Sequence, residues 1–467
     1  MHQMRSGCLV VTVARLLGLS GVARGQDSMG EPAPEALPDE LVNVPVDLPG
    51  HEEGPRRRPK DELAAAEAPA EAEPEAAPEW FGGKPLHEWS RLTGNWGGAR
   101  DSLERVGVFF NGSYTMDWSA VFSGGVDRDS SYRHLLDVNL KLDFEKLVGL
   151  KGGTFFLDFY STSGESLSRD VGDFTLVSNI ETAEAEDQIA ELWYEQRLFD
   201  DVLRIKFGKV EANSEFAFLN HGADFVNSGA AFPSTFQGFP TYPEPATSLN
   251  VFVYPAHWLY AGFGWYDGAT LDGFATGGRG PATFFSDSKS SSWSFIGEMG
   301  VTAEELGFLR NARLALGGLG HTNEIAAYDG GTQDGAAQFY ALAEALVWKR
   351  VADDPDDKQG LAAVVRYCWA DEEVTVAGNY LAGGVQLTGT FSGRESDTTG
   401  VFASWLDMSD ADGAGFDGDE WVIEWFYKVQ VTPWLSVKPD LQYVIDPSGN
   451  QDIDDALVGI LRVEVVF

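Results

Sequence analysis

Residues 419 to 467 constrain the fold more than any other part of this chain, because their side chains alternate between apolar and polar. A period of two puts successive side chains on opposite faces of a β-sheet. An aromatic and aliphatic face opposite a charged face is the pattern of a membrane-spanning barrel strand. The pattern predicts strands that meet lipid on one side and water on the other. In the first strand the apolar face holds Trp421, Ile423, Trp425, Tyr427, Val429 and Val431, and the other face holds Glu420, Glu424, Lys428 and Gln430.

Similar amphipathic stretches follow one another from residue 107 onward, separated by connections that alternate between long and short. Long outer loops, short periplasmic turns and a last strand ending on an aromatic residue, here Phe467, are typical of bacterial outer-membrane barrels. In hydrocarbon every backbone N–H and C=O needs a partner, so an antiparallel sheet must close on itself. We therefore expect an all-β fold, a transmembrane antiparallel β-barrel of about 16 strands with a water-filled lumen. The strands are predicted to start near residues 107, 134, 153, 187, 202, 247, 257, 291, 311, 337, 361, 379, 397, 419, 434 and 457.

One residue breaks the strand pattern locally. Pro439 lies in the middle of a predicted strand and has no N–H to donate to a neighbouring strand. Proline inside a sheet is found at edges or at bulges, so a β-bulge is expected at Pro439.

The first 106 residues have a different character. Arg5 precedes an apolar run from Leu9 to Leu19, and the small residues Ala23 and Gly25 follow, so residues 1–25 are interpreted as a signal peptide. Residues 26–79 are acidic and rich in Pro and Ala, with almost no aromatic residues, and are predicted to form a disordered spacer. Residues 80–106 form an N-terminal segment, and residues 107–467 form the barrel domain.

Composition excludes one class of partner and leaves others open. The formal net charge is −39, which argues against nucleic acid. The same charge fits a cation-favouring pore, metal-binding outer loops or a saline habitat. No cofactor or metal is expected. The segment from Met408 to Glu420 is similar to a calcium loop, but Met408 and Asp419 stand where that motif requires Asp and Glu.

Paired carboxylates raise the alternative of an enzyme that cleaves glycosides. Glu191 with Glu195, or Glu420 with Glu424, would point to the same side of one strand. Residues four apart on a strand lie roughly 13 Å apart. That separation exceeds the distance between the carboxyl groups of glycosidases, so the chain is not expected to be an enzyme.

Several short motifs follow one another along the chain in a particular order. They include Leu92-Thr93-Gly94-Asn95-Trp96-Gly97-Gly98-Ala99-Arg100, Phe207-Gly208-Lys209 with Phe216, Phe239-Pro240-Thr241-Tyr242-Pro243, Gly360-Leu361 through Arg366-Tyr367, Gly393-Arg394 with Asp397, and Thr432-Pro433-Trp434-Leu435 with Pro439-Asp440-Leu441-Gln442-Tyr443. In this order the chain resembles the carbohydrate-selective porins of bacterial outer membranes over nearly all of residues 90–467. The acidic spacer and the Asp-rich outer segments depart from the family.

The resemblance implies a sixteen-stranded barrel in outer-membrane lipid, preceded by a short helix in the N-terminal segment. It also implies passive, substrate-selective diffusion of neutral mono- or oligosaccharides, glucose among them, into the periplasm. A homotrimer is expected by family analogy only. The alternatives are a general cation-preferring diffusion porin and a structural outer-membrane anchor.

Sugar passage requires polar groups for hydroxyls and aromatic platforms for the apolar faces of the ring. Inward positions on the predicted strands supply such groups, and Trp193 among charged neighbours is the most informative of them. The alternative is that these charges only hydrate the lumen and pair across strands. The candidates for contact with substrate are Glu191, Trp193, Glu195, Arg204, Lys206, Arg366, Glu424, Asp440 and Gln442.

The connection from Glu211 to Ala246 is long and rich in aromatic residues, which argues against disorder. It is predicted to fold into the barrel and to narrow the pore. The alternative is an outer loop whose aromatic side chains pack against one another. The residues expected to form the constriction are Phe216, Phe225, Phe232, Phe236 and Tyr242.

Overall fold

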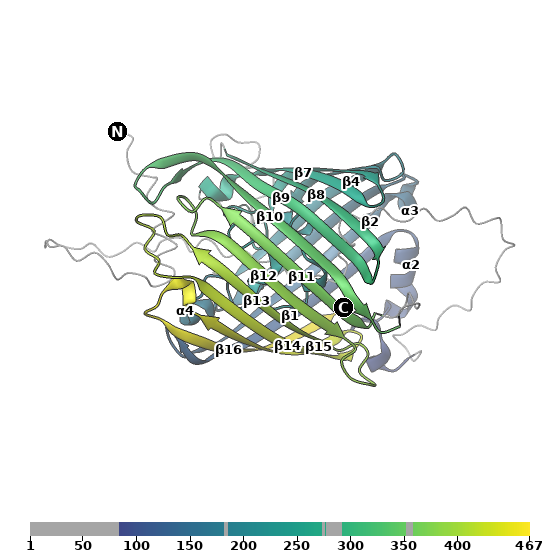
Figure 1. The fold of residues 1–467 in the computed structure, drawn as a ribbon. Helices are drawn as coiled ribbons and strands as arrows, with labels where there is room; N and C mark the ends of the chain where they lie inside the picture. The colour runs from purple at the N-terminus through teal and green to yellow at the C-terminus, as the bar shows by residue number, and fades with distance from the viewer. Residues whose placement is uncertain (1–83, 182–184, 273–275, 277–291, 352–357) are drawn as a thin grey trace.

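The computed structural model describes residues 84–181, 185–272, 276, 292–351 and 358–467. Within this part sixteen strands pair with their neighbours in chain order, and β1 pairs with β16 to close the barrel (Figure 1). The strands are β1 Val108–Gly125, β2 Ser130–Asp143, β3 Gly153–Gly164, β4 Glu186–Leu198, β5 Leu203–Val210, β6 Ala246–Ala256, β7 Leu259–Asp267, β8 Trp293–Leu306, β9 Leu309–Ala326, β10 Thr332–Lys349, β11 Gly360–Ala370, β12 Ala377–Thr388, β13 Thr398–Met408, β14 Glu420–Thr432, β15 Leu435–Ile445 and β16 Asp454–Val466.

The predicted barrel and its strand count are confirmed. The first strand begins at Val108 and the fourteenth at Glu420, each one residue from its predicted start. The bulge predicted at Pro439 is wrong. Pro439 pairs in register with Leu461 on β16, and the register with β14 is the same on both sides of it. Between the pairs Phe426–Asp440 and Val429–Val437, β14 and β15 are not paired, and this gap accommodates the proline. Neither strand has an extra residue there.

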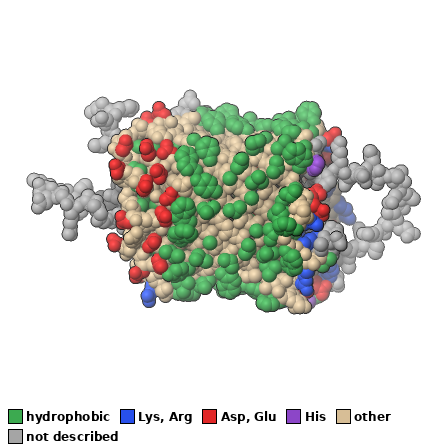
Figure 2. Space-filling model, in the orientation of Figure 1, with side chains coloured by type: hydrophobic (Ala, Val, Ile, Leu, Met, Phe, Trp, Pro, Cys, Tyr) green, Lys and Arg blue, Asp and Glu red, His purple; other side chains and the backbone are tan. Residues whose placement is uncertain are grey.

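Side chains along each strand alternate between the two faces of the barrel wall, as β14 illustrates. Trp421, Ile423 and Trp425 are each almost half exposed on the outside. Glu420 and Glu424 point inward and are fully buried. Hydrophobic side chains cover the middle of the visible outer face, and acidic side chains gather at the end opposite the helix α2 (Figure 2). The apolar band and the charged end are arranged as in a barrel that crosses a membrane.

In the part of the chain that the structure describes, no helix has the length and apolar character needed to span a membrane. The helices are short: α2 Ala99–Arg105, α3 Phe144–Val148, α4 Ser168–Val171 and α5 Ser228–Ala231. The 3₁₀ turns are η2 Leu86–Glu88, η3 Trp96–Gly98, η4 Ala212–Ser214, η5 Asn220–Gly222, η6 Ala269–Asp272 and η7 Pro447–Gly449. The signal peptide and the spacer predicted for residues 1–79 lie outside the described residues.

The N-terminal segment packs against the seam between β1 and β16, at the same end of the barrel as α3 (Figure 1). Arg100 in α2 is buried and donates hydrogen bonds to the backbone carbonyls of Gly94, Phe110 and Phe467. The backbone of Phe467 exchanges two hydrogen bonds with Gly112 on β1. A Cβ atom at Gly112 would lie 2.4 Å from the Phe467 ring, so a larger residue at this position would displace that ring. Arg100 thus ties α2 to both strands of the seam.

Candidate functional site in the narrowed lumen

Two long connections between strands turn into the barrel. Residues 165–181, which follow β3, are called the first inner segment, and residues 211–245, which join β5 to β6, are called the second inner segment. Both contact inward-facing side chains of distant strands, which form the lumen wall. The prediction that residues 211–245 fold inward therefore agrees with the contacts that they make.

Wall glutamates hold the second inner segment by its backbone. Glu298 on β8 accepts a hydrogen bond from the Ala217 N–H at 2.9 Å, and Glu344 on β10 accepts one from the His221 N–H at 2.9 Å. Glu424 on β14 accepts hydrogen bonds from Val226 N–H at 2.6 Å and Asn227 N–H at 3.1 Å. Because a buried carboxylate satisfies buried amide donors that have no strand partner, these bonds fix the course of the segment along the wall.

The first inner segment is held in the same way. Glu420, four residues before Glu424 on β14, accepts hydrogen bonds from the backbone N–H groups of Phe174 at 2.6 Å and Thr175 at 2.9 Å. The same carboxylate accepts a hydrogen bond from Ser448 N–H at 2.7 Å. One strand thus carries an attachment point for each inner segment.

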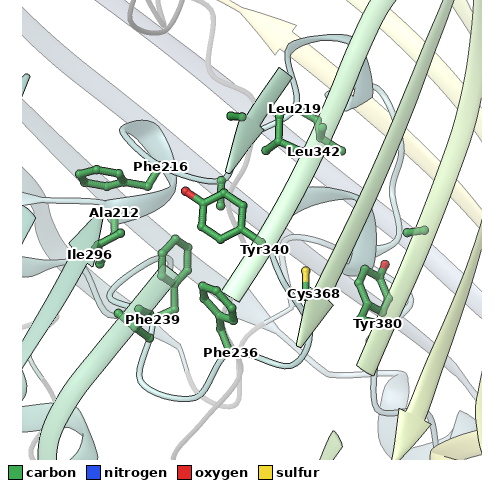
Figure 3. Close-up of a cluster of buried hydrophobic side chains, with 14 of the residues drawn as sticks. Ala212, Phe216, Leu219, Phe236, Phe239, Ile296, Tyr340, Leu342, Cys368 and Tyr380 are labelled. Carbon is green, nitrogen blue, oxygen red and sulfur yellow. The ribbon is translucent and has the colours of Figure 1, made fainter. Parts of the chain in front are cut away.

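Aromatic packing seats the second inner segment against the wall. The Phe225 ring lies 5.2 Å from the ring of Phe402 and 5.3 Å from that of Phe426. Gly400 makes room for it, since a Cβ there would lie 2.6 Å from Phe426 and 2.9 Å from Phe225. Figure 3 shows Phe236 beside Tyr340 of β10, and their ring centroids are 5.7 Å apart. Of the five aromatic residues predicted at the constriction, Phe216, Phe225, Phe236 and Tyr242 are buried, and Phe232 is partly buried.

Many charged side chains of the wall form ion pairs. Arg313 lies 2.8 Å from Glu298 and 3.3 Å from Glu344. Arg462 lies 2.8 Å from Asp117. Further ion pairs join Arg204 to Glu195 and Glu215, Lys206 to the same two carboxylates, and Arg133 to Glu181. Pairing at this distance neutralises part of the charge on the wall.

One charged cluster in the lumen remains partly exposed. Asp224 of the second inner segment lies 2.7 Å from the Lys428 ammonium group of β14, and this group lies 3.7 Å from Glu464 of β16. The side chains of these three residues are 19%, 22% and 23% exposed, whereas Lys438, 3.5 Å from Asp224, is buried. Asp224, Lys428 and Glu464 therefore present acceptors and a donor to the lumen.

The nine residues predicted to contact substrate occupy two kinds of environment. Eight of them are buried: Glu191, Glu195, Arg204, Lys206, Arg366, Glu424, Asp440 and Gln442. They contact the wall or the inner segments, as the ion pairs of Glu195 and the hydrogen bonds of Glu424 to backbone amides illustrate. Contact between these eight residues and a solute stays a prediction.

Trp193 is partly exposed, but its indole ring is already covered. The Phe156 ring stacks on it with centroids 4.9 Å apart, and the Lys206 ammonium group lies 3.8 Å from the ring centroid. An aromatic ring and a cation therefore already contact the indole ring, and they limit the area on which a sugar could stack.

The pKa values of acidic groups in the second inner segment differ with their neighbours. Burial, together with repulsion from Glu191, raises the pKa of Glu211 to about 7. Burial alone would raise the pKa of Asp224, but Lys428 and Lys438 outweigh it and lower that pKa. In the same way Arg204 and Lys206 lower the pKa of Glu215. Acid therefore acts first on Glu211, at the beginning of the segment.

Several wall residues were not among the predicted candidates. The alternation of β14 already placed Lys428 and Glu420 on the inner face, and it could equally have marked Glu298, Arg313 and Glu344 on their strands. No pattern in the sequence pointed to Asp224, which lies in irregular structure. Among the described residues, no group of three or more His, Cys, Asp and Glu side chains has the arrangement of a metal site.

A closed sixteen-stranded barrel with an apolar outer band and two inner segments attached to its inner wall defines a porin. The chain belongs to the family "Carbohydrate-selective porin, OprB family", whose model matches residues 127–467. The protein is therefore an outer-membrane sugar porin of bacteria, and its family and fold indicate a channel rather than an enzyme.

A relative and two solved structures are similar to the chain over most of its length. The chain is 25% identical to Porin B of Pseudomonas aeruginosa over 433 residues, covering 82% of this chain and 92% of the relative. The high-pH structure of OprB from Pseudomonas putida is 21% identical, has a TM-score of 0.74, and covers 82% of this chain and 100% of that one. The low-pH structure of the same protein is 20% identical, with a TM-score of 0.54, and covers 82% and 99%.

Proposed function

We propose that the lumen passes neutral mono- and oligosaccharides, glucose among them, by selective passive diffusion into the periplasm. The observation that carries this proposal is the pairing of wall charges around two firmly held inner segments. The lumen contains ion pairs such as those of Arg313 and Arg462, which neutralise part of its charge, and a neutral solute has no net charge for the remaining field to act on. The lumen still presents many groups that can exchange hydrogen bonds with sugar hydroxyls.

The cluster of Asp224, Lys428 and Glu464 is the proposed point of contact with sugar. These side chains are accessible from the lumen and carry both acceptors and a donor, which suits the hydroxyl groups of a sugar. The buried candidates, such as Glu195 and Glu424, would then act indirectly, by holding the inner segments that define the width of the lumen.

Single-channel conductance of the purified protein in a planar bilayer tests the function. Ion current is recorded while glucose, other neutral sugars and a sugar acid are added in turn. Saturable block by a neutral sugar, with weaker block by the sugar acid, is the expected result. Open current without sugar block would favour a general cation-preferring porin, and no current would favour a structural anchor.

Asp224→Asn tests the contact site. The substitution keeps the shape of the side chain but removes the charge that accepts hydrogen bonds. A hydrogen bond to a charged group contributes about 1.5–3 kcal/mol, so the glucose concentration for half-maximal block should rise about tenfold or more. Asp200→Asn is the matched control, because Asp200 is exposed in the turn between β4 and β5. Equal block in the wild type and Asp224→Asn would exclude Asp224 as a sugar contact.

A homotrimer in outer-membrane lipid is also proposed, by analogy with porins as a class. Native mass spectrometry of the protein in detergent would give the mass of the assembly directly. A monomer mass at all detergent concentrations would contradict the analogy without affecting the proposal of sugar passage.

A further inference from the structure

Four charged side chains of the lumen form a closed arrangement in which opposite charges alternate. The Lys428 ammonium group lies 2.7 Å from Asp224 and 3.7 Å from Glu464. The Lys438 ammonium group lies 3.5 Å from Asp224 and 3.9 Å from Glu464. Each ammonium group thus lies close to both carboxylates. These four residues are called the charge square, and their formal charges cancel.

Three neighbouring strands and the second inner segment supply the members of the charge square. Lys428 lies on β14, Lys438 on β15 and Glu464 on β16, which are adjacent in the barrel wall. All three lie near the ends of their strands, towards the end of the barrel that carries α2 and the C-terminus (Figure 1). The second inner segment brings Asp224 to them, so the square joins this segment to the wall.

Neighbouring polar groups fix the two carboxylates of the square. Ser436 Oγ donates a hydrogen bond to Glu464 at 2.7 Å, and Gln386 Nε2 donates one to Asp224 at 3.3 Å. Lys438 also donates a hydrogen bond to the backbone carbonyl of Asp224 at 2.8 Å. Burial alone would raise the pKa of Asp224, but the two ammonium groups outweigh burial and lower that pKa. Asp224 is therefore charged at neutral pH.

The charge square is more exposed than the ion pairs of Arg313 and Arg462. The side chains of Asp224, Lys428 and Glu464 are 19%, 22% and 23% exposed. No side chain in the pairs of Arg313 and Arg462 with their carboxylates is more than 4% exposed. Because the interaction between two charges weakens with distance, the exposed members of the square act on a solute at shorter range than these buried pairs do.

We propose that the charge balance of the square sets the preference of the pore for neutral over charged solutes, an inference that rests on the proposed passage of sugars. Because ammonium and carboxylate groups alternate, their fields largely cancel a short distance away. A neutral sugar exchanges hydrogen bonds with both kinds of group. A sugar acid meets no net positive charge that would offset the loss of its hydration. Lys428 and Glu464 therefore determine specificity, since removing either one unbalances the square by one charge.

Reversal potentials in a potassium chloride gradient measure charge preference without sugar. Glu464→Gln leaves one excess positive charge, and Lys428→Met leaves one excess negative charge. By Coulomb's law a unit charge about 6 Å from an ion in water changes the occupancy of that ion about threefold. The permeability ratio of potassium to chloride should therefore fall about tenfold in Glu464→Gln and rise about tenfold in Lys428→Met. Unchanged ratios in both variants would overturn the proposal.

The double variant Lys428→Met/Glu464→Gln separates charge balance from a loss of structure. It removes one charge of each sign, so its permeability ratio should return to the wild-type value although more contacts are lost. A ratio as far from the wild type as that of either single variant would overturn the proposal. Lys151→Met is the control, because Lys151 is exposed and pairs with Asp200 in a neighbouring turn. Its ratio should equal that of the wild type, and an equal shift in this control would also overturn the proposal.

Liposome swelling extends the test to sugars, with glucose and gluconate as the probes. Relative to glucose, gluconate should enter about threefold faster through Glu464→Gln and about threefold slower through Lys428→Met than through the wild type. Equal gluconate-to-glucose ratios in all three proteins would overturn the proposal. A wild type that admits no glucose would contradict the proposed function, whereas the reversal potentials report on the charge square in either case.

Discussion

Replacing Glu424 by alanine should release one part of the second inner segment while the barrel stays closed. The Glu424 carboxylate accepts hydrogen bonds from Val226 N–H at 2.6 Å and Asn227 N–H at 3.1 Å. Both donors are in a buried region, and leaving one buried donor unpaired costs about 1–3 kcal/mol. Two such donors give a loss of about 2–6 kcal/mol in the attachment of the segment. Water that enters the space left by the Glu424 side chain would bond to these donors, and the loss of free energy would then lie at the lower end of this range.

Amide hydrogen exchange measures this attachment locally, since exchange at a site reports the free energy of opening there. At about 1.4 kcal/mol for each factor of ten, the amides of Val226 and Asn227 should exchange roughly 30-fold to 10⁴-fold faster in Glu424→Ala. Glu424→Gln keeps one acceptor oxygen, so its effect should be about half as large on the energy scale.

The neighbouring Glu420 supplies a matched control on the same strand. Glu420→Ala removes the acceptor for Phe174 and Thr175, so exchange should accelerate at those amides and stay near the wild-type rate at Val226 and Asn227. The reverse pattern is expected for Glu424→Ala. If either variant accelerated exchange equally in both inner segments, the two glutamates would not be separate attachment points and the argument would fail.

Two further predictions concern the seam and the response to acid. Arg100→Ala should lower the free energy of unfolding by about 3 kcal/mol, because its hydrogen bonds to the seam are lost. Urea titration followed by gel mobility measures this loss, and Arg105→Ala, at an exposed position, is the control. Equal stability of Arg100→Ala and the wild type would contradict the seam contact. Because the pKa of Glu211 is raised from 4.5 to about 7, the cost of its charge is absent below pH 4.5 and complete above pH 7. Lowering the pH from 8 to 5 should therefore add about 3 kcal/mol to the free energy of unfolding in the same urea titration, and Glu211→Gln should abolish that part of the pH dependence.

The fold was largely predictable because each barrel strand carries its own evidence. Alternation identifies a strand and its two faces from a few residues, without information from the rest of the chain. It therefore placed Glu420, Glu424 and Lys428 on the inner face correctly. Pro439 shows the limit of such local reasoning, since the neighbouring strands accommodated the proline by leaving positions unpaired, with no change of register.

The candidate site was less predictable, because an inward-facing side chain can be covered by an inner segment and so be inaccessible from the lumen. Which inward residues stay accessible depends on where the inner segments lie, and these contacts join residues about 200 positions apart, as Glu424 and Val226 do. Aromatic content indicated that residues 211–245 would fold inward, but it did not indicate that Asp224 would reach Lys428. The Arg394 motif has a local explanation: Asp397 accepts hydrogen bonds from Arg394 and Tyr427, which orders a turn between strands.

The position of β14 in the chain sets an order of events during assembly. Glu420 and Glu424 hold amides that precede them by 246 and 198 residues, so neither attachment can form before the fourteenth strand is in place. Contacts at such separations form late, after most of the chain has been organised. A barrel with fewer strands inserted would contain inner segments without their final anchors. The inner segments therefore reach their final attachment only near the end of biogenesis, and a chain truncated before β14 would lack both anchors.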